Sequence, residues 1–189
     1  MSTSISELLD VARLLAAGPI GAADEASERA TANPPDGLGD LLVTSRFMHL
    51  LTIRREQLRL GELEPVLVAS LELNPRRLPR PLVATARLEA GDLEGATAQL
   101  DTFVDELDQV TQDWVYVATL SFAADAAVDC GHDVLARALR GRFDQVAPQV
   151  VVGCTGLIVG SHIDRHRGAL AAVSGDLDEG IATLASVVA

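Results

Sequence analysis

Aromatic residues are scarce in this chain, and their scarcity limits how its interior can be built. Phe, Trp and Tyr make up only 3% of the 189 residues, although hydrophobic residues as a whole reach 48%. A buried core must therefore be filled mainly by Leu, Val and Ala. Because Ala and Leu are strong helix formers, the composition favours α-helices. The length suits one domain or one continuous array of repeats.

Basic residues and long apolar runs are also in short supply. The formal net charge is −12, whereas binding to nucleic-acid phosphates requires cationic side chains concentrated on one face. No stretch approaches the ~20 apolar residues of a membrane span, and the first ten residues are polar and acidic, unlike a signal peptide. We therefore expect a soluble, cytoplasmic protein that binds neither nucleic acid directly nor a membrane.

Cysteine motifs are absent. The two cysteines, Cys130 and Cys154, lie far apart and form no CxxC-type pair. Since a free cysteine behaves as a small hydrophobe, we expect both to be reduced, buried thiols, with a disulfide as the alternative.

Sustained alternation of apolar and polar residues, which is typical of a half-buried strand, is missing as well, so we predict no sheet. The valine run at 150–152 resembles a strand, but we interpret it as a buried connection. Apolar residues recur instead at helical spacing, for example at Leu93, Ala96, Leu100 and Phe103. The chain is therefore predicted to be all-α.

A glycine followed by an acid recurs where one apolar helical run ends and the next begins. The glycine can close the first helix in the left-handed conformation, and the acid can cap the second helix or favour its positive N-terminus. The phrase Gly-acid-Leu-acid occurs at 61–64, 91–94 and 175–178, with looser copies at 130–133 and around 18–21. These spacings are on the scale of helical repeats, so we expect antiparallel helix pairs.

The predicted fold is a single helical-repeat domain over residues 1–189, in the form of a right-handed array of antiparallel helix pairs. Proline-containing connections at 33–37 and 74–81 interrupt the helices but are too short to separate domains. The ten expected helices form five consecutive pairs: 4–17 with 21–32, 38–60 with 62–73, 81–90 with 92–109, 112–130 with 132–146, and 155–174 with 176–188.

From about Pro81 to the end, the chain resembles the tetratricopeptide-like helical region of large bacterial regulators, namely LuxR-type (MalT-like) and related ATPase-linked transcriptional regulators. The resemblance lies in ARLEAGDLEGA at 86–96, VVVG at 150–153 leading to Gly160, and DRHRGALAA at 164–172 running into GDLDE at 175–179. It implies a TPR-like α-solenoid over 81–189, with a less regular part over 1–75, in a setting of signal reception and transcription regulation.

These motifs are scaffold motifs, so the resemblance transfers no catalytic residue. The chain also lacks a GxxxxGK[ST] nucleotide loop and a recognisable helix-turn-helix. No Ser-His-acid arrangement or catalytic cysteine signature can be argued either. We therefore expect a protein that is not an enzyme and that needs no cofactor.

His162 and His166 form the most specific candidate metal-binding motif in the sequence. On a helix their spacing of four places both imidazoles on one face, where they could share a metal. A third ligand and an HExxH glutamate are missing, however, and we expect no metal. The alternative is a solvated or partner-facing helix surface, to which Arg165 would also belong.

Four arginines, Arg76, Arg77, Arg80 and Arg87, cluster around the second proline-rich connection. Because guanidinium groups pair bidentately with carboxylates and phosphates, this cluster could clamp a partner or ligand. Charge balance against acids on neighbouring helices is the alternative.

Trp114 and Tyr116 are the only Trp and Tyr, and both lie near the start of a first-of-pair helix. Such helices line the concave surface of a tetratricopeptide-like array, where an aromatic ring can anchor a peptide. Either ring could instead fill the core. We expect one ring in each role, without assigning which.

Three glycines, Gly153, Gly156 and Gly160, resemble a phosphate cradle on paper, but no Lys follows and no convincing strand precedes them. We interpret them as small residues that let two helices approach closely.

The last predicted helix carries Ile181, Leu184, Val187 and Val188 on a surface that no further repeat would cover. Exposed apolar patches usually mark interaction sites. We therefore expect this end to meet another copy, as in a homodimer, or a different protein, or to continue in a longer chain.

Taken together, the sequence predicts an interaction module that binds a protein, a peptide or a small-molecule signal in the groove of its repeats. Two alternatives belong to other classes. One is a small enzyme or metal-binding protein that uses His162 and His166, and the other is an oligomerisation scaffold.

Overall fold

The computed structural model describes residues 3–32, 39–73, 78–113, 115–147, 149–153 and 158–187. Within these ranges the chain forms ten α-helices and one two-stranded sheet, so the predicted all-α class of about ten helices is confirmed. The helices are α1 (Thr3–Ala17), α2 (Ile20–Thr31), α3 (Gly39–Glu56), α4 (Glu64–Leu73), α5 (Pro79–Glu89), α6 (Leu93–Glu106), α7 (Tyr116–Asp129), α8 (Asp133–Phe143), α9 (Ile163–Val173) and α10 (Leu177–Val187). Short 3-10 helices are η1 (Leu60–Leu63) and η2 (Leu107–Gln109), and the strands are β1 (Val150–Gly153) and β2 (Ile158–His162).

Most of the predicted elbows have the expected backbone. Four glycines at these elbows have a positive φ: Gly18, Gly91, Gly131 and Gly175. Between α5 and α6, the side chain of Asp92 accepts a hydrogen bond from the N–H of Gly95 at 2.8 Å, as an N-cap should. The copy at Gly61 differs, because there the residue with positive φ is Leu58 and the 3-10 helix η1 follows it.

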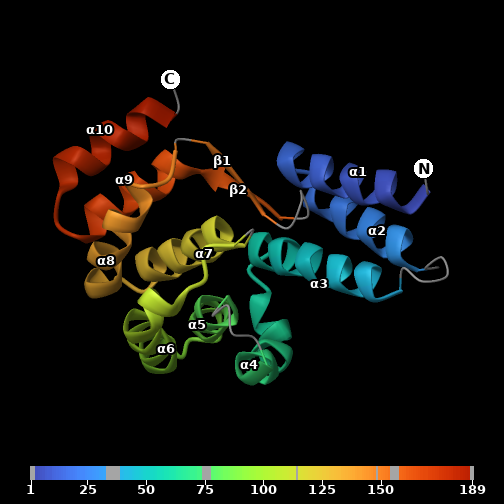
Figure 1. Ribbon diagram of the computed structural model, residues 1–189, viewed down its shortest axis with the longest axis horizontal. Coiled ribbons are helices and arrows are strands. Elements are labelled where there is room, and N and C mark those ends of the chain that lie inside the picture. Colours follow the sequence, from blue (N-terminus) through green and yellow to red (C-terminus); the bar gives the residue numbers. More distant parts are fainter. Residues whose placement is uncertain are drawn as a thin grey trace.

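The helices fall into two groups that meet near the middle of the molecule (Figure 1). The N-terminal group consists of α1, α2 and α3, which pack against one another. In the second group, α5 pairs with α6, α7 with α8 and α9 with α10, while α7 also contacts both α5 and α9. Helix α4 packs on α5 and η1, so the predicted pairing of the third helix with the fourth is wrong. The right-handed solenoid arrangement stays a prediction.

The expectation of no sheet is wrong, because β1 and β2 form an antiparallel hairpin. Val152 lies opposite Val159 and Gly153 opposite Ile158, so β-branched residues supply much of the pairing. The hairpin occupies part of the range predicted as a helix from residue 155, and α9 begins only at Ile163. It contacts α7 on one side and both α1 and α3 on the other, so it lies between the two groups of helices.

The glycines near the hairpin do not separate two helices, and that interpretation is wrong for the two that the structure describes. Gly153 belongs to β1 and Gly160 to β2. A Cβ at Gly160 would lie 3.2 Å from the Cβ of Val151, so the small residue lets the two strands pack closely. Gly156 lies outside the described residues.

The core is built mainly from Leu, Ala and Val, with the rings of Phe103 and Phe143 fully buried in it. Helix α7 is its central element, since every residue from Ala118 to Ala127 is buried. Cys130, just after α7, is a free thiol, as predicted, but it is half-buried and not fully buried. Burial raises the pKa of this thiol, and the nearby Asp129 raises it further. Cys154 lies outside the described residues.

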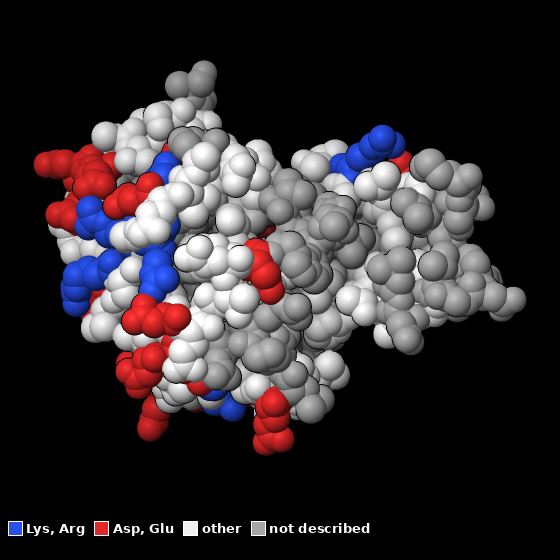
Figure 2. Space-filling model, viewed as in Figure 1, with Lys and Arg blue, Asp and Glu red and all other residues white. Residues whose placement is uncertain are grey.

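Charges of both signs alternate over α6, α8 and α10 on the face shown in Figure 2. Arg140 of α8 pairs with Asp176 and Glu179 at the start of α10, and Arg142 pairs with Asp108 in η2. These arginines therefore balance acids of neighbouring helix pairs. No helix among the described residues is both long enough and apolar enough to cross a membrane.

Candidate functional site

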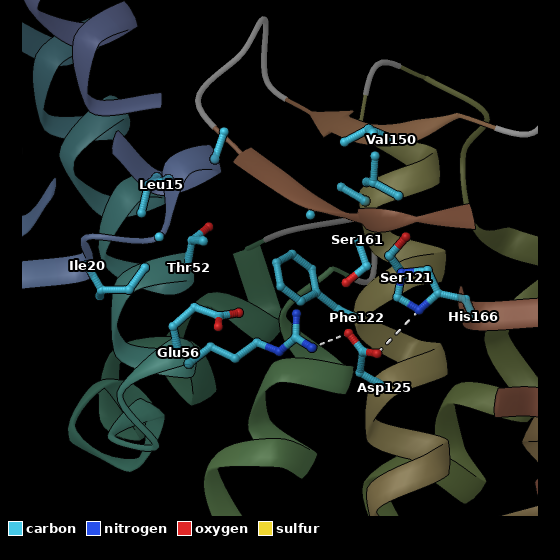
Figure 3. A pocket seen from close by; sticks show the side chains of 16 residues that line it. Leu15, Ile20, Thr52, Glu56, Ser121, Phe122, Asp125, Val150, Ser161 and His166 are labelled. Atoms are coloured by element: carbon cyan, nitrogen blue, oxygen red, sulfur yellow. Dashed lines mark hydrogen bonds and ion pairs between the residues drawn. The ribbon is translucent and has the colours of Figure 1, made fainter. Parts of the chain in front are cut away.

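The two groups of helices and the hairpin enclose a cavity of about 480 Å³ (Figure 3). Its position follows from the hairpin, which spans the distance between α7 and the N-terminal helices. The lining residues are Leu15, Ala16, Gly18 and Ile20 from the α1–α2 region, Thr52, Arg55 and Glu56 from α3, Ala118, Ser121, Phe122 and Asp125 from α7, Val150, Val151, Gly160 and Ser161 from the hairpin, and His166 from α9.

A buried carboxylate, Asp125, is the centre of a charged network at one wall of this cavity. Its Oδ1 atom lies 3.2 Å from Nδ1 of His166 and 3.1 Å from Nη1 of Arg165, and its Oδ2 atom accepts from Arg55. Burial alone would raise the pKa of Asp125. The hydrogen bond from His166 and the electrostatic effects of Arg55, His166 and Arg165 outweigh burial and lower this pKa to about 2. Asp125 is therefore a carboxylate at neutral pH.

Arg55 is held by a second contact besides Asp125. Its guanidinium carbon lies 5.4 Å from the centre of the Phe122 ring, within the range of a cation–π interaction. Arg165 in turn donates to the hydroxyl oxygen of Ser161 at 3.2 Å. Helices α3, α7 and α9 and strand β2 are thus connected through one carboxylate and two arginines.

Two polar atoms that line the cavity are buried and have no hydrogen-bond partner among the described residues, namely Nε2 of His166 and Oγ1 of Thr52. The His166 side chain is only 2% exposed, and its ring stacks on Phe143 with the centroids 5.7 Å apart. Leaving a buried polar atom without a partner costs roughly 1–3 kcal/mol, so each such atom needs a physical explanation. Three others among the described residues, Nε2 of His49, Oε1 of Glu89 and Nε of Arg167, do not belong to residues that line this cavity.

The contact with Asp125 determines which hydrogen-bonding role Nε2 can take. In the neutral imidazole, the carboxylate holds the proton on Nδ1, which leaves Nε2 as an acceptor. An Asp–His pair of this kind occurs in catalytic triads. Neither Ser121 nor Ser161 forms the third member, however, because Nε2 is bonded to no described hydroxyl group.

The predicted arrangement of His162 and His166 on one exposed helix face is wrong. His162 ends β2 and caps α9, with its Nδ1 accepting from the N–H of Asp164 at 3.3 Å. His166 is buried against Asp125, while Arg165 beside it is half exposed and bound to the same carboxylate. The described residues contain no group of three or more His, Cys, Asp and Glu that could hold a metal ion.

The arginine cluster matches the charge-balance alternative where it is described. Arg80 lies 2.8 Å from Glu106 of α6, and Arg87 lies 3.1 Å from Glu64 of α4. Both are partly buried and neither lines the cavity. Arg76 and Arg77 lie outside the described residues.

The remaining candidates that the structure describes do not line the cavity either. Tyr116 begins α7 and packs half-buried against the core, while Trp114 lies outside the described residues. On α10, Ile181 is 66% exposed, and Leu184 and Val187 are each 37% exposed. This apolar surface is uncovered within the described chain. Val188 lies outside it.

The sequence analysis missed Thr52, Arg55 and Asp125. A signal existed only for Asp125, because a lone acid within the alanine-rich stretch of α7 from Ala118 to Ala127 has to be paired when that stretch is buried. Nothing local identifies its partner Arg55, which precedes it by 70 residues.

Comparisons of the chain with protein-family models, with curated proteins and with solved structures find no match. The likeness to bacterial regulators therefore stays a prediction.

Proposed function

We propose that this protein is a helical receptor module that binds a small organic molecule in the cavity between its two groups of helices. The observation that carries the proposal is the pair of buried, unpartnered polar atoms, Nε2 of His166 and Oγ1 of Thr52, in the wall of that cavity. Cavities of ~300–1,000 Å³ with apolar walls and a few polar groups are typical of small-molecule sites.

The rigidity of the charged wall supports this proposal. Asp125 is held from three sides, and its contacts determine the position and tautomer of His166. A polar group that is oriented before the ligand arrives loses little conformational entropy on binding. The network therefore suits recognition better than it suits stability alone, since buried charge pairs are weak evidence for stability.

The place of the cavity supports a signalling role. A molecule bound there contacts α1 and α3 on one side and α7, the hairpin and α9 on the other. Such a molecule would stabilise one relative position of the two groups by its differential affinity for that state. This is the behaviour expected of the sensory region of a transcriptional regulator, the setting that the sequence resemblance implies.

Binding can be tested with N-phenyl-1-naphthylamine, an uncharged dye whose fluorescence rises in apolar sites. Ala16 and Ala17 are adjacent exposed residues of α1, but only Ala16 lines the cavity. We expect saturable 1:1 binding by the wild type, loss of binding in Ala16→Trp, and unchanged binding in the matched control Ala17→Trp. Absence of saturable binding, or equal binding by the two variants, would contradict the proposal.

A second candidate function is protein association through α10. Leu177 and Ile181 are 62% and 66% exposed on this helix, and exposed apolar patches often mark protein interfaces. Self-association through this surface is compatible with ligand binding, because α10 does not line the cavity.

A further inference from the structure

The hydrogen-bonding state of His166 limits what the cavity can bind. Its Nδ1 donates to Asp125. Because Arg55 and Arg165 also pair with this carboxylate, Asp125 stays ionised. When Nδ1 alone carries the ring proton, the one free site of the imidazole is the lone pair of Nε2. Figure 3 shows this second nitrogen on the cavity side of the ring, away from the bond to Asp125.

The hydroxyl groups of the cavity wall do not supply the missing donor. Ser121 donates its proton to the carbonyl oxygen of Val117 at 2.9 Å. The hydroxyl oxygen of Ser161 accepts a hydrogen bond from Arg165. Its hydroxyl group is not hydrogen-bonded to Nε2 of His166. Since Nε2 is buried and has no partner among the described residues, a water molecule or a ligand in the cavity can supply the donor, and a ligand that does so takes the place of the water.

Charge balance argues for a neutral ligand. Arg55 and Arg165 are both bound to Asp125, and the carboxylate of Glu56 also lines the cavity. When Nδ1 is the only protonated ring nitrogen of His166, these two cations and two anions leave no net charge to attract an ionised group.

The rest of the wall is apolar. Phe122 and Val151 are buried there, together with Leu15 from α1. These side chains would contact a hydrocarbon body and gain free energy by removing it from water. Thr52, on the opposite side of the cavity in Figure 3, offers a hydroxyl that can donate or accept.

We propose that the ligand is a neutral, largely apolar molecule bearing a hydroxyl group, an alcohol or a phenol, which donates its hydrogen bond to Nε2 of His166. This inference rests on the proposed function of the cavity as a binding site. It adds the chemical class of the ligand and the residue that selects it.

The test compares 2-naphthol with 2-methoxynaphthalene, which has the same ring system and oxygen atom but no donor. Binding to the wild type is measured by titration calorimetry at pH 7, where 2-naphthol is neutral. We expect 2-naphthol to bind about tenfold more tightly, as one satisfied buried acceptor implies. The preference should fall to about onefold in His166→Phe, which keeps a ring against Phe143 but has no acceptor, and should persist in Ala17→Trp, which does not line the cavity.

A second readout needs no variant. The chain has four histidines, so the ring ¹⁵N resonances of the wild type can be resolved by NMR. Titration with 2-naphthol should move the Nε2 resonance of His166 in the direction of a hydrogen-bonded acceptor, and 2-methoxynaphthalene should not. If His166→Phe fails to fold, this measurement alone tests whether the ligand donates a hydrogen bond to Nε2 of His166.

The outcomes separate the two proposals. If both probes bind the wild type equally, the hydroxyl inference is overturned and the binding function stands. If the preference for 2-naphthol is lost in Thr52→Val and kept in His166→Phe, the hydroxyl group of the ligand bonds to Thr52 and not to His166, and the inference is again overturned. If neither probe binds and N-phenyl-1-naphthylamine also fails, the proposed function is wrong and the inference falls with it.

Discussion

The Nδ1 atom of His166 lies 3.2 Å from the Oδ1 atom of Asp125, and this contact connects α9 to α7 beside the cavity. Helix α7 is buried along most of its length, so it can carry a carboxylate only where partners surround it. The same contact that stabilises the carboxylate orients the imidazole toward the cavity. Structure and proposed recognition therefore depend on one pair of residues.

Removing Asp125 should destabilise the protein strongly. In Asp125→Ala, the partly buried guanidinium of Arg55 and the imidazole of His166 lose their acceptor, which should lower the free energy of unfolding by about 3 kcal/mol. Urea unfolding measures this loss. The control Asp133→Ala breaks an exposed pair with Arg137 and should cost less than about 1 kcal/mol. Equal losses in the two variants would mean that the buried network adds no stability.

Stability should fall as the pH drops from 6.5 to 4 because of His49. Burial and, to a smaller extent, the charge of Arg46 together lower the pKa of this ring to about 4. In this pH range the imidazole of His49 binds a proton in the unfolded chain but not in the folded chain. The free energy of unfolding therefore decreases as the pH falls. The effect should reach about 3 kcal/mol at pH 4.

The variant His49→Asn should remove this pH dependence. It keeps a polar atom near the hydroxyl of Ser27, which lies 2.8 Å from Nδ1 of His49, but it has no proton to gain. Urea unfolding at a series of pH values should show a flatter profile for the variant between pH 6.5 and 4. Parallel profiles for wild type and variant would assign the pH dependence to other groups.

Helices α9 and α10 should tolerate no added methyl group where their backbones meet. A Cβ at Gly168 would lie 2.7 Å from Cγ of Leu184 and 3.0 Å from the carbonyl oxygen of Gly180. Gly168→Ala should therefore lower the free energy of unfolding by about 1–3 kcal/mol, as overpacking does.

Gly141 provides the matched control, because it lies in α8 and a Cβ there would meet nothing within 4 Å. Gly141→Ala should stabilise the protein by about 0.5–1 kcal/mol through its better helix propensity. Thermal unfolding followed by circular dichroism compares the two variants. A shift of the same sign in both would show that the α9–α10 contact is looser than described.

The apolar surface of α10 should mediate self-association. Ile181→Glu places a charge in the middle of this surface, whereas Val134→Glu places one on α8, where the side chain is 49% exposed. Sedimentation equilibrium should show a dimer for the wild type and for Val134→Glu, and a monomer for Ile181→Glu. A wild type that is monomeric at high concentration, with unchanged behaviour in Ile181→Glu, would exclude this role.

The sequence by itself determined the helices. Gly91 with Asp92 marks the end of α5 and the start of α6, and the predicted range 92–109 corresponds to Leu93–Glu106 followed by η2. These signals work because glycine conformation, capping and helical periodicity act within a few residues of chain. The lone acid of α7 was a usable signal as well, although its partners could not be read.

Only the tertiary structure decided the hairpin and the cavity. Strands of four and five residues such as β1 and β2 carry a weak pattern, and their pairing is fixed where they pack between α7 and the N-terminal helices. Because β2 ends at His162, the two histidines do not share a helix face. Asp125 meets Arg55 and Arg165 across 70 and 40 residues of chain. Such contacts depend on how whole helices pack, and no local propensity encodes which distant side chain will meet a buried charge.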